Sequence, residues 1–320
     1  MDALILAAGE GTRLLPLTRI RPKPLFPILN RPLLENTFNY LSRFSIQRTI
    51  LNTHHLATQI EHFIRTQKKY WPFGIETRFE PEILNTGGGI GNTRDFWRSD
   101  PFVVINSDIL TDIDLQKAVD FHQNHHGPVT LILHDYPEFN NILVDRQGRI
   151  QELRQKKGSG LAFTGIYLLN REIFNFLPAS GNYDIIPIYQ QMIKEGIPVW
   201  AHVSQGHYWR DIGTSASYLK VHEELLSGDS NLENSIPFPP PFVKGGLGGI
   251  FSHPEARIEE GVEFSGWACI GKGCLLKKGC RIHNCVLWEE VTVESGASVS
   301  ESILGKGVHL KNDLQSGVLV

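Results

Sequence analysis

The sequence lacks the features that mark membrane proteins and nucleic-acid-binding proteins. Its net charge is −3, so no overall positive field exists to hold nucleic acid, and any polyanion site must be local. The longest apolar runs, such as Leu4–Ala8 and Val129–Leu133, are too short to span a bilayer. The N-terminus enters a strand-like segment without the basic region or cleavage site of a signal peptide. We therefore expect a cytoplasmic protein that binds neither nucleic acid nor membrane.

Length and composition favour a soluble protein of two domains. The chain has 320 residues, of which 41% are apolar and 20% charged. Up to about Ser227, short apolar runs alternate with amphipathic patterns, which is typical of βαβ units around a mostly parallel, Rossmann-like sheet. Ligands of such sheets bind beyond the carboxyl ends of the strands. The pattern predicts strands at Leu4–Ala8, Thr49–Asn52, Phe102–Asn106 and Val129–Leu133, and helices at Leu33–Phe44, Ala57–Thr66 and Asp114–His125.

The rest of the chain follows a different pattern. Prolines and glycines between Asn231 and Gly249 indicate an exposed linker. We predict a catalytic domain at 1–228, a linker at 229–252 and a repeat domain at 253–320.

A six-residue apolar period begins near Pro254 and predicts a short parallel β-helix of about three triangular coils. The repeat resembles the left-handed hexapeptide β-helix. Four cysteines lie within it with neither a CxxC zinc pattern nor a clear disulfide framework, and several of them suit compact inward positions. The large apolar positions are Ile258, Phe264, Ile270, Leu276, Ile282, Leu287, Val293, Val299, Leu304 and Leu310, and the cysteines are Cys269, Cys274, Cys280 and Cys285.

The segment after the first strand is glycine-containing and basic. Gly9 and Gly11 would let the backbone approach an anion closely, although such a pattern alone also suits an ordinary strand-to-helix turn. Four prolines between Pro16 and Pro27 prevent a helix and stiffen the segment. Four cations on a stiff loop at the mouth of a parallel sheet suit a triphosphate and its pyrophosphate leaving group. These cations are Arg13, Arg19, Arg21 and Lys23.

Two motifs resemble a known enzyme family. Leu-Ala-Ala-Gly-x-Gly-Thr-Arg at residues 6–13 and Pro-Lys-Pro-Leu at residues 22–25 look like the signature of the sugar-1-phosphate nucleotidyltransferases, also called nucleotide-sugar pyrophosphorylases. The resemblance covers roughly residues 1–228. It implies that Arg13 and Lys23 stabilise phosphate charge during catalysis. It also implies that the glycine-rich turn wraps the nucleotide through Leu6, Ala7, Ala8, Gly9, Gly11 and Thr12.

Two aspartates are candidate ligands of Mg²⁺. Asp108 ends a buried strand, and Asp211 lies in the sequence Trp-Arg-Asp-Ile-Gly-Thr. Two carboxylates with water and phosphate oxygens suit octahedral Mg²⁺. Each residue alone also suits a structural role, a turn or helix cap for Asp108 and an ion pair for Asp211. Both match the metal-binding positions of the family, although Ser107 stands where the family usually has glycine.

Further substrate contacts follow from the resemblance. The family's base-contacting segment matches Glu80, Thr86, Gly87 and Gly88, although Glu80 also suits a surface acid. Lys156 aligns with the lysine that binds the sugar phosphate, but its neighbours differ from the family pattern, so this alignment could shift by one residue. The expected contacts of the sugar phosphate are Asn141, Lys156, Thr164 and Gly165.

These motifs predict transfer of a nucleoside monophosphate from an NTP to a sugar 1-phosphate. A mannose-1-phosphate guanylyltransferase is our first expectation, and a uridylyltransferase for N-acetylmuramate or glucose 1-phosphate is the alternative. Two other classes are a hexapeptide acyltransferase and a non-catalytic, nucleotide-sugar-binding regulatory subunit. Trp267 and Trp288 lie outside the inward series of the repeat, so we expect them to be exposed and to form a homo-oligomer contact.

Overall fold

A computed structural model describes residues 1–154, 158–227 and 249–320. The chain divides into two compact units that interleave in sequence. Unit 1 comprises Met1–Glu10 and Thr37–Trp209, and unit 2 comprises Gly11–Asn36 and Arg210–Val320. No helix in the described ranges has the length and apolar character needed to cross a bilayer.

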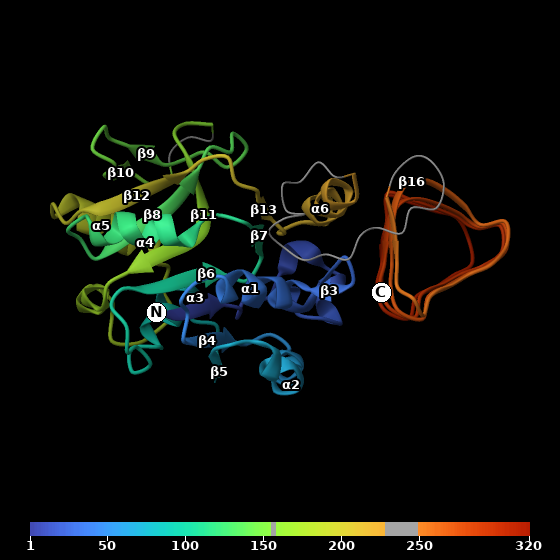
Figure 1. The fold of residues 1–320 in the computed structure, drawn as a ribbon, viewed down its shortest axis with the longest axis horizontal. Helices are drawn as coiled ribbons and strands as arrows, with labels where there is room; N and C mark the ends of the chain where they lie inside the picture. The colour runs from blue at the N-terminus through green and yellow to red at the C-terminus, as the bar shows by residue number, and fades with distance from the viewer. Residues whose placement is uncertain (155–157, 228–248) are drawn as a thin grey trace. The chain divides into compact units, whose positions relative to one another are not determined.

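Unit 1 is built on a seven-stranded sheet with strand order β12-β8-β11-β6-β1-β4-β5 (Figure 1). All neighbouring strands are parallel except at β11, which is antiparallel to both β6 and β8. This arrangement confirms the mostly parallel sheet. The strands are β1 (Asp2–Leu6), β4 (Arg48–Thr53), β5 (Gly74–Phe79), β6 (Phe102–Asn106), β8 (Val129–His134), β11 (Ala162–Leu169) and β12 (Val199–Ser204).

Helices cover both faces of this sheet. On one face, Ile90 and Tyr189 from α3 and α5 join an apolar cluster with residues of the strands. Helix α4 contacts β8, β11 and β12 with side chains outside that cluster, and Asp114 caps its first turn by accepting from the Gln116 and Lys117 N–H groups. The helices are α1 (Leu33–Ser42), α2 (Ala57–Gln67), α3 (Asn85–Gly91), α4 (Leu115–Gln123) and α5 (Ile186–Lys194), and the short strands are β7 (Ile109–Thr111), β9 (Leu143–Val144), β10 (Ile150–Glu152) and β13 (Trp209–Asp211).

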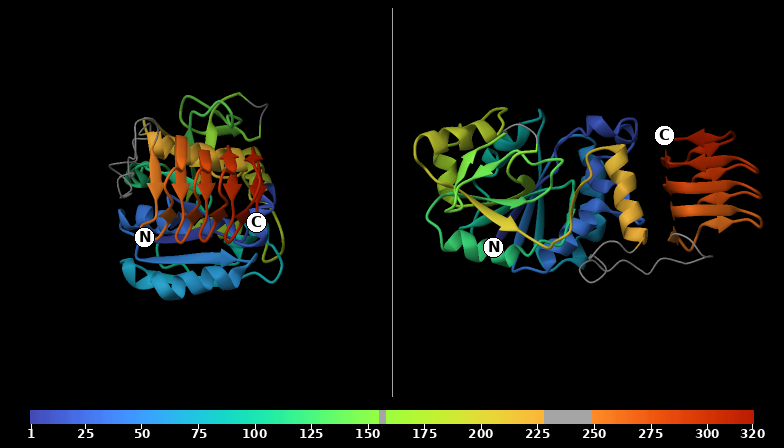
Figure 2. Two further views of the ribbon diagram at one scale, coloured as in Figure 1. Left: turned by 90° about the vertical axis from the view of Figure 1, so that its right-hand side faces the viewer. Right: turned by 90° about the horizontal axis from the view of Figure 1, so that it is seen from above.

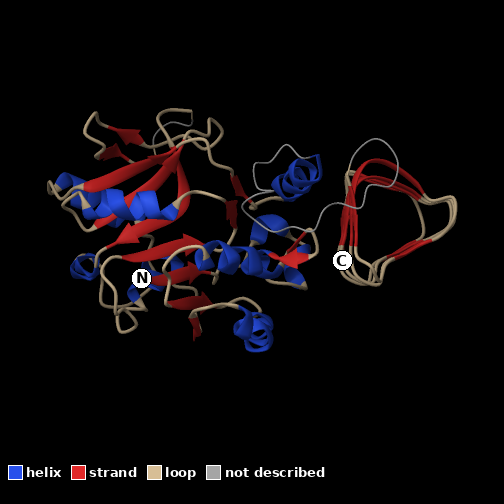
Figure 3. Ribbon diagram, in the orientation of Figure 1, coloured by secondary structure: helices blue, strands red, loops and turns tan. Residues whose placement is uncertain are grey.

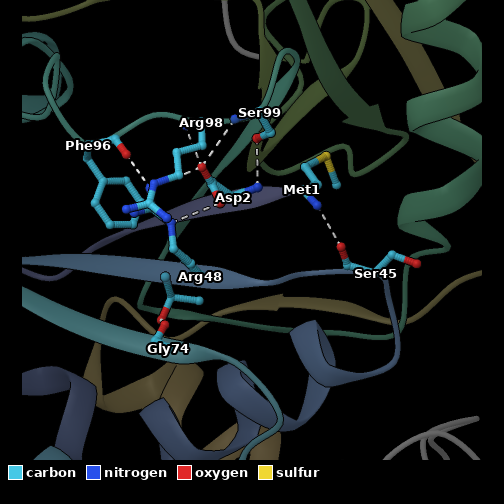
Figure 4. A network of polar contacts seen from close by, with 9 residues as sticks. Met1, Asp2, Ser45, Arg48, Gly74, Phe96, Arg98 and Ser99 are labelled. Carbon is cyan, nitrogen blue, oxygen red and sulfur yellow. Dashed lines mark hydrogen bonds and ion pairs between the residues drawn. The ribbon is translucent and has the colours of Figure 1, made fainter.

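The amino ends of β1 and β4 are fixed by a polar network around Asp2 (Figure 4). The Asp2 carboxylate is buried and accepts from the Arg98 N–H at 2.8 Å, the Ser99 N–H at 3.3 Å and the Arg48 guanidinium at 3.3 Å. Burial alone would raise the pKa of Asp2, but these hydrogen bonds lower it overall. The Arg48 guanidinium also lies 4.1 Å from the centre of the Phe96 ring. The network lies at the edge of the sheet opposite the carboxyl ends of its parallel strands.

The first segment of unit 2 contains no α-helix before Leu33, as its prolines predict. It forms three short 3-10 helices, followed by a small hairpin. Helix α6 follows later in the sequence. These elements are η1 (Thr12–Leu14), η2 (Leu17–Arg19), η3 (Lys23–Leu25), β2 (Pro27–Ile28), β3 (Arg31–Pro32) and α6 (Ser215–Ser227).

The C-terminal part of unit 2 is a stack of parallel strands, consistent with a β-helix (Figures 2 and 3). Ile258 pairs with Leu276 and Leu276 with Val293, so successive coils repeat after 18 and then 17 residues. This shortening explains the slip in the six-residue period. The ladder β15-β17-β19-β22 has four described rungs, one more than the three coils expected, and β14 lies within the range assigned to the linker. The left-handed direction of the coils stays a prediction.

These strands form three ladders. The first ladder contains β14 (Ile250–Ser252), β16 (Glu263–Ile270), β18 (Arg281–Leu287), β20 (Ser298–Ser300) and β23 (Leu314–Gln315). The second contains β15 (Arg257–Ile258), β17 (Leu275–Leu276), β19 (Thr292–Val293) and β22 (His309–Leu310). The third branches from β18 and contains β21 (Ile303–Leu304) and β24 (Val318–Leu319).

The predicted inward residues of the repeat do form one apolar interior. Cys274, Cys280 and Cys285 belong to it, which confirms their packing role, whereas Cys269 does not. All four cysteines are free and buried. Burial raises the pKa of Cys274 to about 11 and that of Cys285 to about 12, so these thiols stay protonated at neutral pH.

Candidate functional site

The carboxyl ends of β1, β4 and β6 lie side by side in unit 1. Leu6, the last residue of β1, pairs with Asn52 of β4 on one side and Asn106 of β6 on the other. The Ser107 N–H donates to the Leu6 carbonyl at 3.1 Å. Asp108 follows directly, so the predicted metal ligand lies at the ligand edge of the sheet, next to the glycine-rich turn.

A buried hydrogen-bond chain supports the start of that turn. The Ala7 N–H donates to Asn52 Oδ1 at 2.8 Å, and Asn52 Nδ2 donates to Glu80 Oε1 at 2.9 Å. The other oxygen of Glu80 accepts from the Leu84 N–H at 3.2 Å. Glu80 is fully buried, and burial raises its pKa although the hydrogen bonds oppose the shift. Its place in this chain of contacts contradicts a surface acid. Through Asn52, Glu80 supports the Ala7 N–H at the start of the turn.

The glycines of the second predicted nucleotide segment have a packing role. The N–H groups of Gly87 and Gly88 both donate to the Tyr183 carbonyl, at 3.0 and 3.1 Å. A Cβ on Gly87 would lie 2.5 Å from Tyr183 Cδ2, and one on Gly88 would lie 2.4 Å from the Gly181 carbonyl oxygen. Only glycine therefore allows α3 to approach residues 181–183. Thr86 is half-buried in the same helix.

The predicted sugar residues fall into different environments. Gly165 has a φ of +81°, and a Cβ there would lie 2.9 Å from Asn106 Nδ2, so it packs on the end of β6. The Thr164 hydroxyl donates to the Ile132 carbonyl at 2.7 Å and is buried. The Asn141 N–H donates to the Leu161 carbonyl at 3.1 Å. Lys156 lies outside the described residues.

In unit 2, the second glycine of the turn packs against the basic loop. This name denotes residues 16–30, the proline-stiffened segment that carries Arg19, Arg21 and Lys23. Gly11 has a φ of +65°, and a Cβ there would lie 2.8 Å from Thr18 Cγ2 and 3.7 Å from Lys23 Cβ. The Thr18 hydroxyl also donates to the Gly11 carbonyl at 3.3 Å. Gly11 and Lys23, which come from two different motifs, are therefore neighbours. Thr12 and Arg13 are exposed directly after this turn.

Arg13 and Asp211 come together around Gly213. A Cβ built on Gly213 would lie 2.4 Å from Asp211 Oδ1 and 2.8 Å from Arg13 Nη2. Both atoms thus lie closer than 3.0 Å to one point. A glycine here leaves room for a guanidinium and a carboxylate at the same place, which suits a phosphate with a bound cation.

The donor set fits Mg²⁺ on chemical grounds. Asp108 and Asp211 both carry the hard oxygen donors that Mg²⁺ prefers; Asp108 lies two residues after β6, and Asp211 is the last residue of β13. Among the residues that the structure describes, no group of three or more His, Cys, Asp and Glu side chains gathers as a ready-made metal site. The protein would supply two carboxylates, and phosphates and water would supply the remaining ligands.

Two expectations from the sequence are wrong. Arg21 forms a bidentate ion pair with Glu289, at 2.7 and 3.1 Å, instead of offering its charge to a triphosphate. Trp267 and Trp288 point away from the β-helix interior, but they are buried, with 6% and 1% exposed. Residues of the same unit cover them, so they do not form an exposed oligomer contact.

Sequence reasoning also missed supporting residues. Asn52 and Tyr183 were not singled out, and only the structure reveals their contacts with the predicted turns. Gly213 lies two residues after Asp211 in the sequence Trp-Arg-Asp-Ile-Gly-Thr, and this position beside a predicted metal ligand is the sequence signal that points to it.

Comparisons with known proteins cover both parts of the chain. The family model described as nucleotidyl transferase matches residues 2–228, and the model described as GMPPB C-terminal domain matches residues 247–315. The chain is 27% identical to a UTP–glucose-1-phosphate uridylyltransferase of Synechocystis, over 95% of this chain and 87% of that protein. It is 27% identical to a mannose-1-phosphate guanylyltransferase of Mycobacterium tuberculosis, over 93% of this chain and 83% of that protein.

Solved structures show the same fold. A putative glucose-1-phosphate thymidylyltransferase from Bacillus anthracis superimposes with a TM-score of 0.62 at 24% identity, covering 69% of this chain and 94% of that one. HddC from Yersinia pseudotuberculosis, solved with GMP-PN, gives a TM-score of 0.61 at 24% identity, over 70% of this chain and 99% of that one. With the family model covering most of the sequence, the chain belongs to the nucleotidyl transferase family.

Proposed function

We propose that the chain transfers a nucleoside monophosphate from an NTP to a sugar 1-phosphate, giving an NDP-sugar and pyrophosphate. The observation that carries this proposal is the grouping of Arg13 and Asp211 around Gly213, with Lys23 beside Gly11 in the same unit. Cations and a carboxylate from separate motifs are what a triphosphate with a bound divalent metal requires. The family match and the names of the relatives agree with this reaction class.

The reaction needs no covalent enzyme intermediate. A phosphate oxygen of the sugar 1-phosphate attacks the α-phosphorus, the bond from that phosphorus to the bridging oxygen breaks, and pyrophosphate leaves. Arg13 and Lys23 balance the charge of the leaving group, and Lys156 holds the sugar phosphate. Asp108 and Asp211 are the carboxylates that would hold Mg²⁺, which would supply further charge neutralisation. The main-chain groups of residues 6–12 line the nucleotide, with Thr86 to Gly88 near the base.

Our preferred substrates are GTP and mannose 1-phosphate. The C-terminal family model and the guanylyltransferase relatives favour this choice. One such relative is the mannose-1-phosphate guanylyltransferase catalytic subunit beta of Xenopus tropicalis, which is 28% identical over 98% of this chain and 93% of that protein. The uridylyltransferase of Synechocystis supports UTP and glucose 1-phosphate as the second candidate.

A pyrophosphate-release screen decides between these candidates. Each of the four common NTPs is combined with mannose, glucose and N-acetylmuramate 1-phosphates in the presence of Mg²⁺. We expect the highest kcat/KM with GTP and mannose 1-phosphate. A maximum with UTP would select the uridylyltransferase. No pyrophosphate from any pair would contradict the proposed function, and an acetyl-CoA assay would then test the acyltransferase alternative.

Two further parts of the proposal concern the state of the protein. We place the enzyme in the cytoplasm and expect a homo-oligomer through the β-helix domain. Trp267 and Trp288 are buried and cannot supply this contact. Strands β22, β23 and β24 are the last described strands of their ladders, and a second copy of the chain could pair with the edge that they form. Light scattering at micromolar concentration tests this expectation, and a monomer would contradict it.

A further inference from the structure

The C-terminal coils hold the basic loop in place within unit 2. Arg21 lies two residues before Lys23, and its guanidinium forms two hydrogen bonds to the Glu289 carboxylate, at 3.1 and 2.7 Å. The same guanidinium lies 4.5 Å from the centre of the Trp288 ring. Burial would raise the pKa of Glu289, but Arg21 lowers it overall, so the pair is ionised at neutral pH. A planar fork held by two oxygens and a ring face fixes one orientation of the Arg21 side chain.

An aromatic contact secures the loop on the other side of Lys23. The Phe26 ring meets the Trp288 ring edge-on, with centroids 4.9 Å apart. Trp288 Nε1 donates to the Tyr218 hydroxyl at 3.1 Å, and that hydroxyl donates to the Pro27 carbonyl. Phe26, Tyr218 and Trp288 are all buried, so the loop, α6 and the coils share one packed contact.

A third contact fixes the end of the loop. Asn30 Nδ2 donates to the Ile270 carbonyl of β16 at 2.8 Å, and the Cys269 thiol lies 3.6 Å from Asn30 Oδ1. Leu29 and Asn30 have positive φ angles of 45° and 64°, a conformation that surrounding contacts must maintain. The coils therefore contact the loop at Arg21, Phe26 and Asn30, before and after Lys23.

We propose that the β-helix of this chain is a positioning scaffold for the phosphate-binding lysine, with Arg21 and Glu289 as positioning residues. The inference rests on the proposed function, in which Lys23 stabilises the transition state. A charge is effective in catalysis when it is already aimed before the reaction begins, because no energy is then spent on reorientation. Without the contact at Arg21, the loop samples more conformations. Lys23 is still present, but it stabilises the transition state less well.

The test uses the full chain with Glu289→Gln, which removes the ion pair but keeps the size of the side chain. Glu294→Gln is the matched control, because Glu294 pairs with Lys277 at 2.9 Å and with His309, and both of these partners lie on the same coils. We expect Glu289→Gln to lower kcat about tenfold with little change in KM, since a transition-state contact is weakened. Amide hydrogen exchange of residues 22–30 should become faster in Glu289→Gln and stay unchanged in Glu294→Gln.

A double variant separates positioning from direct substrate contact. Exchanging the charges, with Arg21→Glu and Glu289→Arg, should restore part of the kcat that Arg21→Glu alone loses. If Arg21 contacts phosphate directly, the exchange restores nothing and Glu289→Gln keeps its full rate, which overturns the proposal. Unchanged hydrogen exchange in Glu289→Gln overturns it as well. The exchange measurement needs no substrate, so it stands even if the screen finds no pyrophosphate release.

Discussion

His222 of α6 accepts a hydrogen bond at Nε2 from the backbone N–H of Leu29, at 3.4 Å. Its Nδ1 lies 2.9 Å from the Tyr218 carbonyl, so Nδ1 carries the proton of a neutral imidazole. The ring is fully buried, and burial lowers its pKa from 6.5 to about 4. A protonated ring could not accept from Leu29, so the neutral form is required by the fold of unit 2.

This linkage predicts a pH-dependent stability. Between pH 6.5 and about 4, the unfolded chain takes up a proton at this position and the folded chain does not. The free energy of unfolding should therefore fall with decreasing pH in that window, by up to roughly 1.4 kcal/mol per pH unit from this group. Denaturant unfolding at pH 7 and pH 5 measures the effect. In His222→Gln the loss should be smaller, while His62→Gln at an exposed position should behave like the parent protein.

Gly213→Ala should disable the enzyme while leaving it folded. The new methyl group would overlap Asp211 Oδ1 and Arg13 Nη2, and both side chains must then move. We expect kcat/KM to fall by at least tenfold, because displacement of charged groups in a preorganised site removes transition-state stabilisation. Gly74→Ala is the control, since its methyl group would meet nothing closer than 4.0 Å. Equal activity of the two variants would contradict the arrangement around Gly213.

The sequence was informative where local periodicity determines structure. The strand at Phe102–Asn106 and the inward series through Leu310 were predicted because alternating or six-residue patterns depend on neighbours in the chain. The burial of Trp288 was not, because the residue that covers it, Phe26, is remote in sequence. The hydrogen bond from Asn52 to the Glu80 carboxylate and the ion pair of Arg21 with Glu289 could not be predicted for the same reason, because their partners are also remote in sequence.

Gly9→Ala tests how closely the nucleotide approaches the turn. A Cβ on Gly9 would meet nothing within 4 Å, and its φ is not positive, so alanine adds no strain to the protein itself. If a nucleotide lies against this backbone, the methyl group should raise KM for the NTP about tenfold or more, because close approach needs a bare glycine. The melting temperature should not change. A variant with the parent's KM would remove Gly9 from the nucleotide site.

Asp108→Asn and Asp211→Asn should each abolish turnover in the presence of Mg²⁺. An amide is neutral and a weaker ligand for a hard cation than a carboxylate. Activity of the parent protein should disappear with excess chelator and return with added Mg²⁺. Circular dichroism should show folded variants. The assignment of these two ligands fails if both variants keep the parent's rate.

Lys23→Ala and Arg13→Ala should each lower kcat by on the order of a hundredfold, because groups that stabilise developing charge contribute several kcal/mol to the transition state. The two residues are held differently: Lys23 is buried beside Gly11, whereas Arg13 is exposed beside Gly213. Arg13→Lys keeps a charge but loses the planar fork, so we expect an intermediate rate from it. Steady-state kinetics on the best substrate pair measures kcat and KM separately. A rise in KM with an unchanged kcat would show that these cations bind the substrate equally in the ground state and the transition state, which would contradict their catalytic role.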